Sequence, residues 1–140
     1  MGRDEALVLL SFHSGRNPDI NNPKWKNGFI GSLRYFNGKL NEDNFVEVME
    51  CLKVLYKDFE SDKIDRNLMA DIYGIFYQTN LWLGNGGWLE NIDLKYKNKI
   101  DTWLKIYSYA IEMLLEYSEQ SCEEAFYEYE AYLEGNSNYE

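Results

Sequence analysis

The chain contains 140 residues, 45% of them hydrophobic and 16% aromatic, which excludes a disordered protein because burying so many large side chains offsets the entropy lost on folding. A net charge of −10 disfavours binding to nucleic acid or to an anionic membrane, and no segment has the roughly 18 consecutive apolar residues of a membrane helix or the pattern of a signal peptide. We expect a single cytoplasmic domain over residues 1–140, with residues 136–140 frayed.

Apolar residues recur at helical spacing along nearly the whole chain, and no segment alternates with a period of two. The expected helices span residues 4–13, 24–36, 41–59, 62–83, 93–115 and 121–134. The short connections between them favour antiparallel neighbours. The sequence therefore predicts an all-α fold, an irregular antiparallel bundle of about five to six helices.

Capping residues mark several of these boundaries. Asn41 is a good N-cap for the third helix, and Ser121 with Glu124 three residues later matches a capping box for the last helix. Gly74 lies inside the fourth helix, where the missing side chain would permit a close helix contact.

The apolar stripes of the last three helices assign a set of residues to the core. That set comprises Leu68, Met69, Ile72, Ile75, Phe76, Leu83, Ile100, Trp103, Leu104, Tyr107, Ile111, Leu114, Leu115, Cys122, Ala125, Phe126, Tyr129 and Leu133. Between the fourth and fifth helices, Trp88 and Leu89 are expected to fold back over the same core.

The inventory of catalytic side chains is poor. His13 is the only histidine, and its place after Phe12 on an apolar helix is typical of a partly buried structural residue. No His-Glu-x-x-His, Cys-x-x-Cys or Glu-x-x-His motif supplies zinc or di-iron ligands. The glycine-rich segment 84–87 follows a helix and lacks the Lys-Ser or Lys-Thr pair of a phosphate loop. We therefore expect no enzyme, no metal and no cofactor.

One carboxylate pattern keeps an enzymatic alternative open. Glu47 and Glu50 lie on the third helix, and Asp62 and Asp65 at the start of the fourth. Pairs of carboxylates on adjacent helices hold magnesium for pyrophosphate hydrolysis, and the pattern loosely resembles the all-α nucleotide pyrophosphatases. The apolar stripe of the third helix nevertheless directs Glu47 and Glu50 toward solvent.

Negative charge is concentrated at the C-terminal end of the sequence. Residues 1–105 hold all 14 Lys and Arg with 15 Asp and Glu, whereas residues 106–140 hold nine Glu and no basic residue. Glu112 and Glu116 lie four residues apart near a helix C-terminus, and such a like-charged pair destabilises the helix by about 0.2–0.5 kcal/mol. The last helix repeats this spacing. A basic partner would relieve the repulsion, so the pattern favours a protein interface.

Tyrosines are interleaved with these glutamates, and tyrosine contributes contact area to interfaces at low entropic cost. Helical spacing directs one tyrosine and most of the acids outward. The expected partner-binding residues are Glu116, Glu119, Glu123, Glu124, Tyr127, Glu128, Glu130 and Glu134. The loop 84–89 is an alternative site, and a solvated charged face without a partner is the remaining interpretation.

Three further features extend over most of the chain. They are a helix, an Asn37-Gly38 turn and a capped helix within residues 29–45, the ending Asn80-Leu81-Trp82-Leu83-Gly84 of residues 68–84, and the later Ile100-x-x-Trp103 motif. In these features the chain resembles the small acidic all-α immunity proteins of bacterial contact-dependent growth inhibition and polymorphic toxin systems. The resemblance implies binding to a basic toxin nuclease made by the same cell. Toxin-contacting residues vary among these proteins, so none is transferred to a numbered position here.

The expected function is therefore neutralisation of a cognate basic toxin domain, a nuclease, by occlusion of its active site or substrate cleft. The expected partners exclude nucleic acid and membrane, and the free protein is expected to be a monomer or a weak homodimer. Two alternatives remain: a nucleic-acid mimic that inhibits a DNA or RNA enzyme, and the magnesium-dependent pyrophosphatase.

Overall fold

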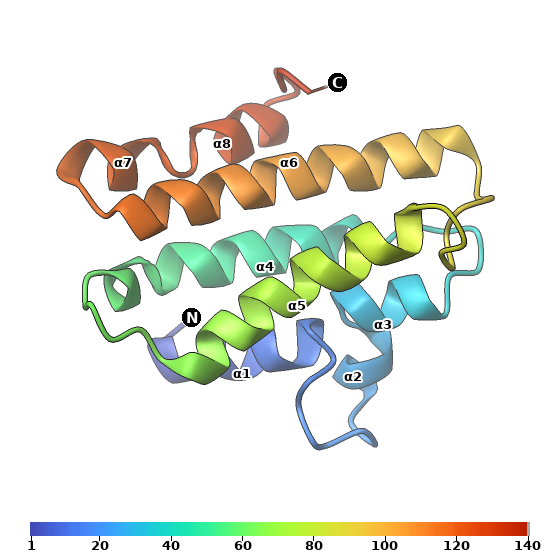
Figure 1. The fold of residues 1–140 in the computed structure, drawn as a ribbon, viewed down its shortest axis with the longest axis horizontal. Coiled ribbons are helices and arrows are strands. Elements are labelled where there is room, and N and C mark those ends of the chain that lie inside the picture. Colours follow the sequence, from blue (N-terminus) through green and yellow to red (C-terminus); the bar gives the residue numbers. More distant parts are fainter. Residues whose placement is uncertain (140) are drawn as a thin grey trace.

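Helices form all the regular structure in the computed structural model, which describes residues 1–139 (Figure 1). They are α1 (Arg3–His13), α2 (Pro23–Asn27), α3 (Phe29–Arg34), α4 (Glu42–Val54), the 3-10 helix η1 (Tyr56–Phe59), α5 (Arg66–Leu83), α6 (Leu94–Glu116), α7 (Glu119–Glu124) and α8 (Tyr127–Leu133). The predicted all-α class is confirmed.

The helices stack in layers around α4 and α5. Helix α1 packs on both of these helices, and α3 contacts both as well. On the other side, α5 contacts α6, the longest helix, and α7 and α8 lie along the far side of α6 (Figure 1). The acidic C-terminal helices therefore form an outer layer, supported by α6.

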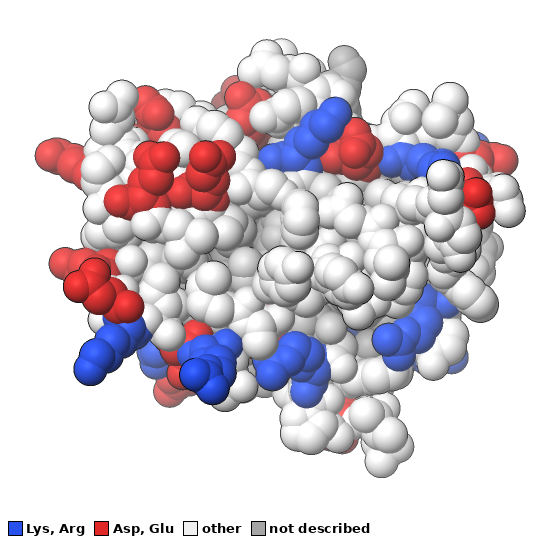
Figure 2. Space-filling model, in the orientation of Figure 1, with Lys and Arg blue, Asp and Glu red and all other residues white. Residues whose placement is uncertain are grey.

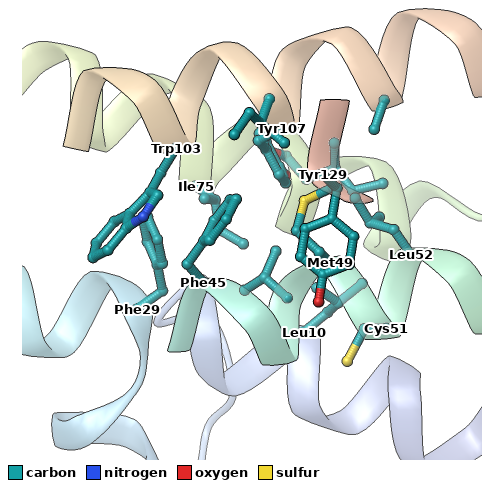
Figure 3. Close-up of a cluster of buried hydrophobic side chains, with 14 of the residues drawn as sticks. Leu10, Phe29, Phe45, Met49, Cys51, Leu52, Ile75, Trp103, Tyr107 and Tyr129 are labelled. Atoms are coloured by element: carbon teal, nitrogen blue, oxygen red, sulfur yellow. The ribbon is translucent and has the colours of Figure 1, made fainter. Parts of the chain in front are cut away.

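An aromatic cluster joins α4, α6 and α8 at the centre of the core (Figure 3). The ring of Phe45 stacks on Trp103, with centroids 5.4 Å apart and planes 9° apart. Tyr129 and Tyr132 meet the Phe45 ring edge-on, at centroid distances of 6.0 and 5.3 Å. Offset and edge-to-face rings stabilise a core beyond the area they bury.

The two buried tyrosines of α8, Tyr129 and Tyr132, form hydrogen bonds to neighbouring helices through their hydroxyls. Tyr129 donates to the Glu50 carboxylate of α4 at 2.8 Å. Tyr132 donates to Glu42, the first residue of α4, and accepts a hydrogen bond from Trp103 Nε1 at 2.9 Å. Burial and the hydrogen bond to Glu50 raise the pKa of Tyr129, so its hydroxyl keeps the proton it donates. Helix α8 is thus fixed to α4 at two points.

The helix predicted over residues 24–36 is broken at Gly28, which has an extended backbone (φ −71°, ψ −175°). A side chain there would meet backbone, because an added Cβ would lie 2.8 Å from the Lys24 carbonyl oxygen. The amide of Phe29 leaves the helical pattern and donates to His13 Nδ1 at 2.9 Å. Helices α2 and α3 therefore meet at an angle, which the apolar spacing alone did not indicate.

The predicted start of the last helix at Ser121 is wrong. The N-cap is Ser118, whose hydroxyl accepts from the Ser121 amide at 2.9 Å, while Ser121 Oγ accepts from the Ser118 amide at 2.8 Å. Ser121 is therefore the third residue inside α7, and Glu124 takes no part in the capping box. The segment 119–133 is divided into α7 and α8, and Tyr132 faces the core in place of the predicted Leu133, which is exposed.

Three other expectations about burial and one about a helix contact differ from the structure. Phe76 and Leu115, assigned to the core, are exposed. Leu89 folds over the core as predicted, but Trp88 points outward. An added Cβ at Gly74 would meet only the Arg16 side chain at 4.0 Å, so this glycine permits no close helix contact.

Residues 136–139, which were expected to fray, contact α6 and α8. The Thr102 hydroxyl donates to the Tyr139 carbonyl at 3.4 Å, and the Asn138 amide donates to Glu128 at 3.1 Å. Glu140, the last residue of that expectation, lies outside the described residues. None of the helices formed by residues 1–139 combines the length and the hydropathy that a membrane crossing requires.

Candidate partner-binding surface

The eight residues predicted to bind a partner are distributed over three helices, and together they are called the acidic surface below. Glu116 ends α6, and the others lie along α7 and α8 or at the C-cap of α8. Six of the eight are exposed, including Tyr127, while Glu124 and Glu128 are half-buried. The structure therefore places the predicted set in the outer layer of the molecule.

The half-buried acids of this set approach α6. Burial, followed by the charges of Glu124 and Glu128, raises the pKa of the Tyr109 hydroxyl. The hydrogen-bond donors to Glu124 and Glu128 are neutral amides. Gln120 donates to Glu124 at 3.0 Å, and Asn138 donates to Glu128 at 3.1 Å. These contacts satisfy the carboxylate oxygens without neutralising their charge.

Glu130 differs from the rest because it has a cation within the molecule. Lys53 Nζ of α4 lies 3.3 Å from its Oε1 atom, a contact the sequence did not reveal since 77 residues separate the two. Within residues 1–139, no other member of the acidic surface lies within 4.0 Å of a Lys or Arg nitrogen. Most of the like-charge repulsion predicted for this segment is therefore present in the folded chain.

A second surface, absent from the predicted set, is an apolar groove between α5 and α6. It encloses about 590 Å³ and is called the α5/α6 groove below. Its lining residues are Met69, Ile72, Tyr73, Phe76, Tyr107, Ser108, Ile111, Glu112, Leu115 and Glu116. Figure 2 shows a broad uncharged area over α5 and α6, bordered by acidic side chains near the C-terminal end of α6.

The groove presents large apolar side chains to solvent. Tyr73 is 62% exposed, Leu115 46% and Phe76 39%. Helix α5 has more apolar residues than one buried stripe requires, and that surplus was the available signal for this surface. Of these three residues, Phe76 and Leu115 were predicted to lie in the core.

The groove and the acidic surface adjoin one another. Glu116 belongs to both, and Glu112 of the groove acts on Tyr109 together with Glu124 and Glu128 to raise its pKa. A shallower hollow of about 350 Å³ continues from Phe76 and Glu112 toward Tyr109. The outer layer and the groove therefore form one continuous surface, acidic along the C-terminal helices and apolar along α5.

His13 is a buried structural residue, as predicted, and three carboxylates of the enzymatic alternative are held in hydrogen bonds within the fold. His13 is buried, and its Nε2 lies 2.9 Å from Glu47 Oε1. Because His13 Nδ1 accepts from a backbone amide, Nε2 must hold the proton that is donated to Glu47. Glu50 accepts from Tyr129, and Asp65 caps α5 through the Leu68 amide at 2.9 Å.

These contacts correct the expectation that Glu47 and Glu50 point freely to solvent. Each accepts a hydrogen bond from a buried side chain, so α4 uses these acids to fix neighbouring elements. Among residues 1–139, no three His, Cys, Asp or Glu side chains are grouped so that they could hold a metal ion. The two carboxylate pairs are therefore not assembled into a magnesium site.

A larger hollow of about 710 Å³ lies at the N-terminal end of α4. Its charged lining residues are of both signs, with Lys26 and Lys39 near Glu42 and Asp43. Because these charges balance within the molecule, the hollow has no net charge that a partner would neutralise.

The His13–Glu47 contact predicts an acid-dependent contribution to stability. The hydrogen bond from His13 and the charge of Lys24 lower the pKa of Glu47 below its ordinary value of 4.5, against the opposing effect of burial. A carboxyl whose folded-state pKa is lowered stabilises the fold above its unfolded pKa, and this stabilisation is lost as the pH falls through the folded value. The free energy of unfolding of wild type should therefore exceed that of Glu47→Gln at neutral pH, and this difference should disappear below about pH 4.5.

Urea unfolding of both proteins between neutral pH and about pH 3 measures this difference, and all the other carboxyls cancel in the comparison. A difference in free energy of unfolding that stays constant across this range would contradict the predicted effect of the His13–Glu47 hydrogen bond.

Comparisons of the chain with protein-family models, with curated proteins and with solved structures returned no match. The functional argument therefore depends on the surface itself.

Proposed function

We propose that this protein is an immunity-type inhibitor that binds a basic toxin domain, a nuclease, and occludes its active site or substrate cleft. The observation that supports it most is the acidic surface, in which Glu130 alone has a cation nearby within the described residues. The remaining carboxylates repel one another until cations from outside the chain approach. A toxin cleft that binds nucleic acid supplies such cations.

Electrostatics also indicates how such a complex would form. An acidic surface and a basic cleft attract one another over about a Debye length, roughly 10 Å at 0.1 M salt, which raises the association rate more than it slows dissociation. The proposed inhibitor acts in the cytoplasm as a monomer or weak homodimer, needs no cofactor and catalyses no reaction. Its own charge opposes direct binding to nucleic acid or membrane.

The sequence is compatible with two other functions. A nucleic-acid mimic that inhibits a DNA or RNA enzyme would use the same acidic surface, and differs only in the identity of the basic partner. The pyrophosphatase has less support, because Glu47, Glu50 and Asp65 are engaged in hydrogen bonds within the fold.

The experiment uses as the partner the product of the neighbouring gene, which this proposal expects to contain a basic toxin-like domain. Charges on the acidic surface are reversed in the triple variant Glu123→Lys, Glu128→Lys, Glu134→Lys, which spares the paired Glu130. Its association rate at low ionic strength should fall by about tenfold or more, and the deficit should shrink at high ionic strength. Stopped-flow mixing measures the rates, and circular dichroism confirms that the variant is folded.

A second triple variant of equal charge, Glu5→Lys, Asp19→Lys, Asp62→Lys, provides the control. All three residues are exposed and lie outside α6 to α8. Its association rate should stay much closer to that of wild type. Equal losses in the two variants would mean that net charge alone matters, and no loss in either would remove the acidic surface from the proposed interface. Inhibition of the toxin's nuclease activity at one-to-one stoichiometry separates an immunity protein from a weak electrostatic binder.

A further inference from the structure

The α5/α6 groove is an apolar slot between two helices, and no other helix among residues 1–139 lines it. Its α5 side extends from Met69 to Phe76 and its α6 side from Tyr107 to Glu116. At 1.5 Å per residue these edges are about 10–14 Å long, two to three helical turns. Grooves between packed helices accept the side-chain ridge of a third helix.

The exposed apolar residues of the groove are contiguous rather than scattered. Tyr73, Phe76 and Leu115 all line the same hollow and all are more than one-third exposed. The ring of Tyr73 also stacks on Tyr77 one turn further along α5, with centroids 5.9 Å apart. A contiguous apolar surface of this kind on a folded domain marks a binding site, whereas single exposed apolar residues do not.

The charge of the groove identifies the chemistry of its occupant. Its only charged lining residues within the described chain are Glu112 and Glu116, one helical turn apart on the α6 edge. A helix that places apolar residues in the slot would bring its own flanking positions against these two acids. Lys or Arg residues four apart on that helix would then pair with both carboxylates.

A polar group at the floor of the slot adds a further feature. Ser108 Oγ is buried and has no hydrogen-bond partner in the described residues, although serine in a helix commonly bonds to a carbonyl one turn earlier. Ser108 lines both the groove and the hollow that continues toward Tyr109. Because this atom has almost no accessible surface, an occupant would reach the hydroxyl only after the surrounding side chains move.

A second copy of the chain fits the groove less well than a basic partner does. Each copy has a net charge of −10, and any pairing through this face would bring two pairs of groove acids into a shared interface. Such repulsion opposes self-association. The charge therefore favours an occupant of the opposite sign.

We infer that the α5/α6 groove binds an amphipathic helix of the basic partner, with apolar residues in the slot and two cations four residues apart against Glu112 and Glu116. The inference depends on the proposed function for the basic character of the partner, and it adds the docking site and the secondary structure of the docked segment. The acidic surface then attracts the partner, while the groove holds it.

The direct test uses a synthetic peptide and needs no natural partner. The peptide has about 14 residues, four turns of helix, with leucines at helical spacing on one face and lysines four apart beside them. Fluorescence anisotropy of the labelled peptide measures its affinity for the full chain. Wild type should bind it, and should bind a matched peptide with glutamate in place of lysine at least about tenfold more weakly.

Two groove variants localise the binding. Tyr73→Ser with Leu115→Ser removes apolar contacts from exposed positions, so the fold is retained, and it should weaken peptide binding by at least about tenfold. Glu112→Gln with Glu116→Gln should weaken binding several-fold at low ionic strength, an effect that disappears at high ionic strength. Leu81→Ser with Leu133→Ser changes equally exposed leucines that do not line the groove and should leave the affinity unchanged.

Several outcomes would overturn the inference. Equal affinity of the groove variants and wild type would do so, as would failure of wild type to bind the lysine peptide. Sedimentation that shows a dimer of wild type but a monomer of the Tyr73→Ser, Leu115→Ser variant would identify the occupant as a second copy.

The same variants separate this inference from the proposed function. If the neighbouring basic domain binds normally to the groove variants but slowly to the acidic-surface variant, the proposed function stands and the groove is not its docking site. If the lysine peptide binds in the groove but the basic domain does not bind the chain, the groove inference stands and the proposed function fails.

Discussion

Replacing Phe45 by alanine is expected to lower the free energy of unfolding by about 3–5 kcal/mol. The Phe45 side chain is 1% exposed and contacts Trp103 of α6 and the two buried tyrosines of α8, Tyr129 and Tyr132. Its removal leaves a cavity at the point where three helices meet, and the surrounding rings are too rigid to fill it. Urea unfolding followed by circular dichroism measures the loss.

Phe76→Ala is the matched control, since it removes the same side chain from a position that is 39% exposed at the groove. The expected loss there is about 1 kcal/mol, because less apolar surface is returned to water. The Phe45 variant should also change the fluorescence of Trp103 at low urea, since its stacking partner is gone. Similar losses in the two variants would contradict the central place of Phe45 in the core.

Replacing Gly31 by alanine is expected to destabilise the fold by at least about 1–3 kcal/mol, although alanine is the better helix former. An added Cβ at this position would lie 2.2 Å from the Trp25 carbonyl oxygen and 2.5 Å from that of Lys26. Both atoms belong to the α2 backbone, which cannot move aside as a flexible side chain can. Helices α2 and α3 would have to separate.

Gly74→Ala gives the opposite expectation with the same chemical change. Gly74 lies inside α5, and an added Cβ would meet only Arg16 Cδ at 4.0 Å, an ordinary van der Waals distance. The substitution should therefore stabilise the fold by about 0.5–1 kcal/mol, the usual difference between glycine and alanine within a helix. Thermal unfolding of the two variants should shift in opposite directions, and a stabilised Gly31→Ala would show that α2 and α3 are not in close contact.

The helix caps and the glycines show which parts of the fold can be predicted from sequence. Asn41 and Asp65 cap α4 and α5 through local hydrogen bonds, and local signals of this kind are visible in the residue order. The close contact at Gly31 and the break at Gly28 depend on segments brought together by folding. The sequence pattern pointed instead to Gly74, where the structure leaves open space.

The candidate binding surface could be predicted only in part, because sequence shows local signals but not contacts that folding creates. The charge of the last three helices is a property of composition, so the acids of the acidic surface could be named without a structure. Lys53 beside Glu130 could not, because it comes from α4. The groove was missed because helical periodicity assigns Phe76 and Leu115 to apolar stripes, but does not say how wide a stripe the neighbouring helices cover.

The two tyrosine–glutamate hydrogen bonds of α8 bear on how this surface would meet a partner. Tyr129 and Tyr132 fix α8 to Glu50 and Glu42 of α4, so the position of this short helix is determined by the core and not by whatever binds outside it. Because this backbone is already fixed, association needs to order only the exposed side chains and not the helix itself. The orientation of the acidic side chains on α8 would then be set during folding, before any complex forms.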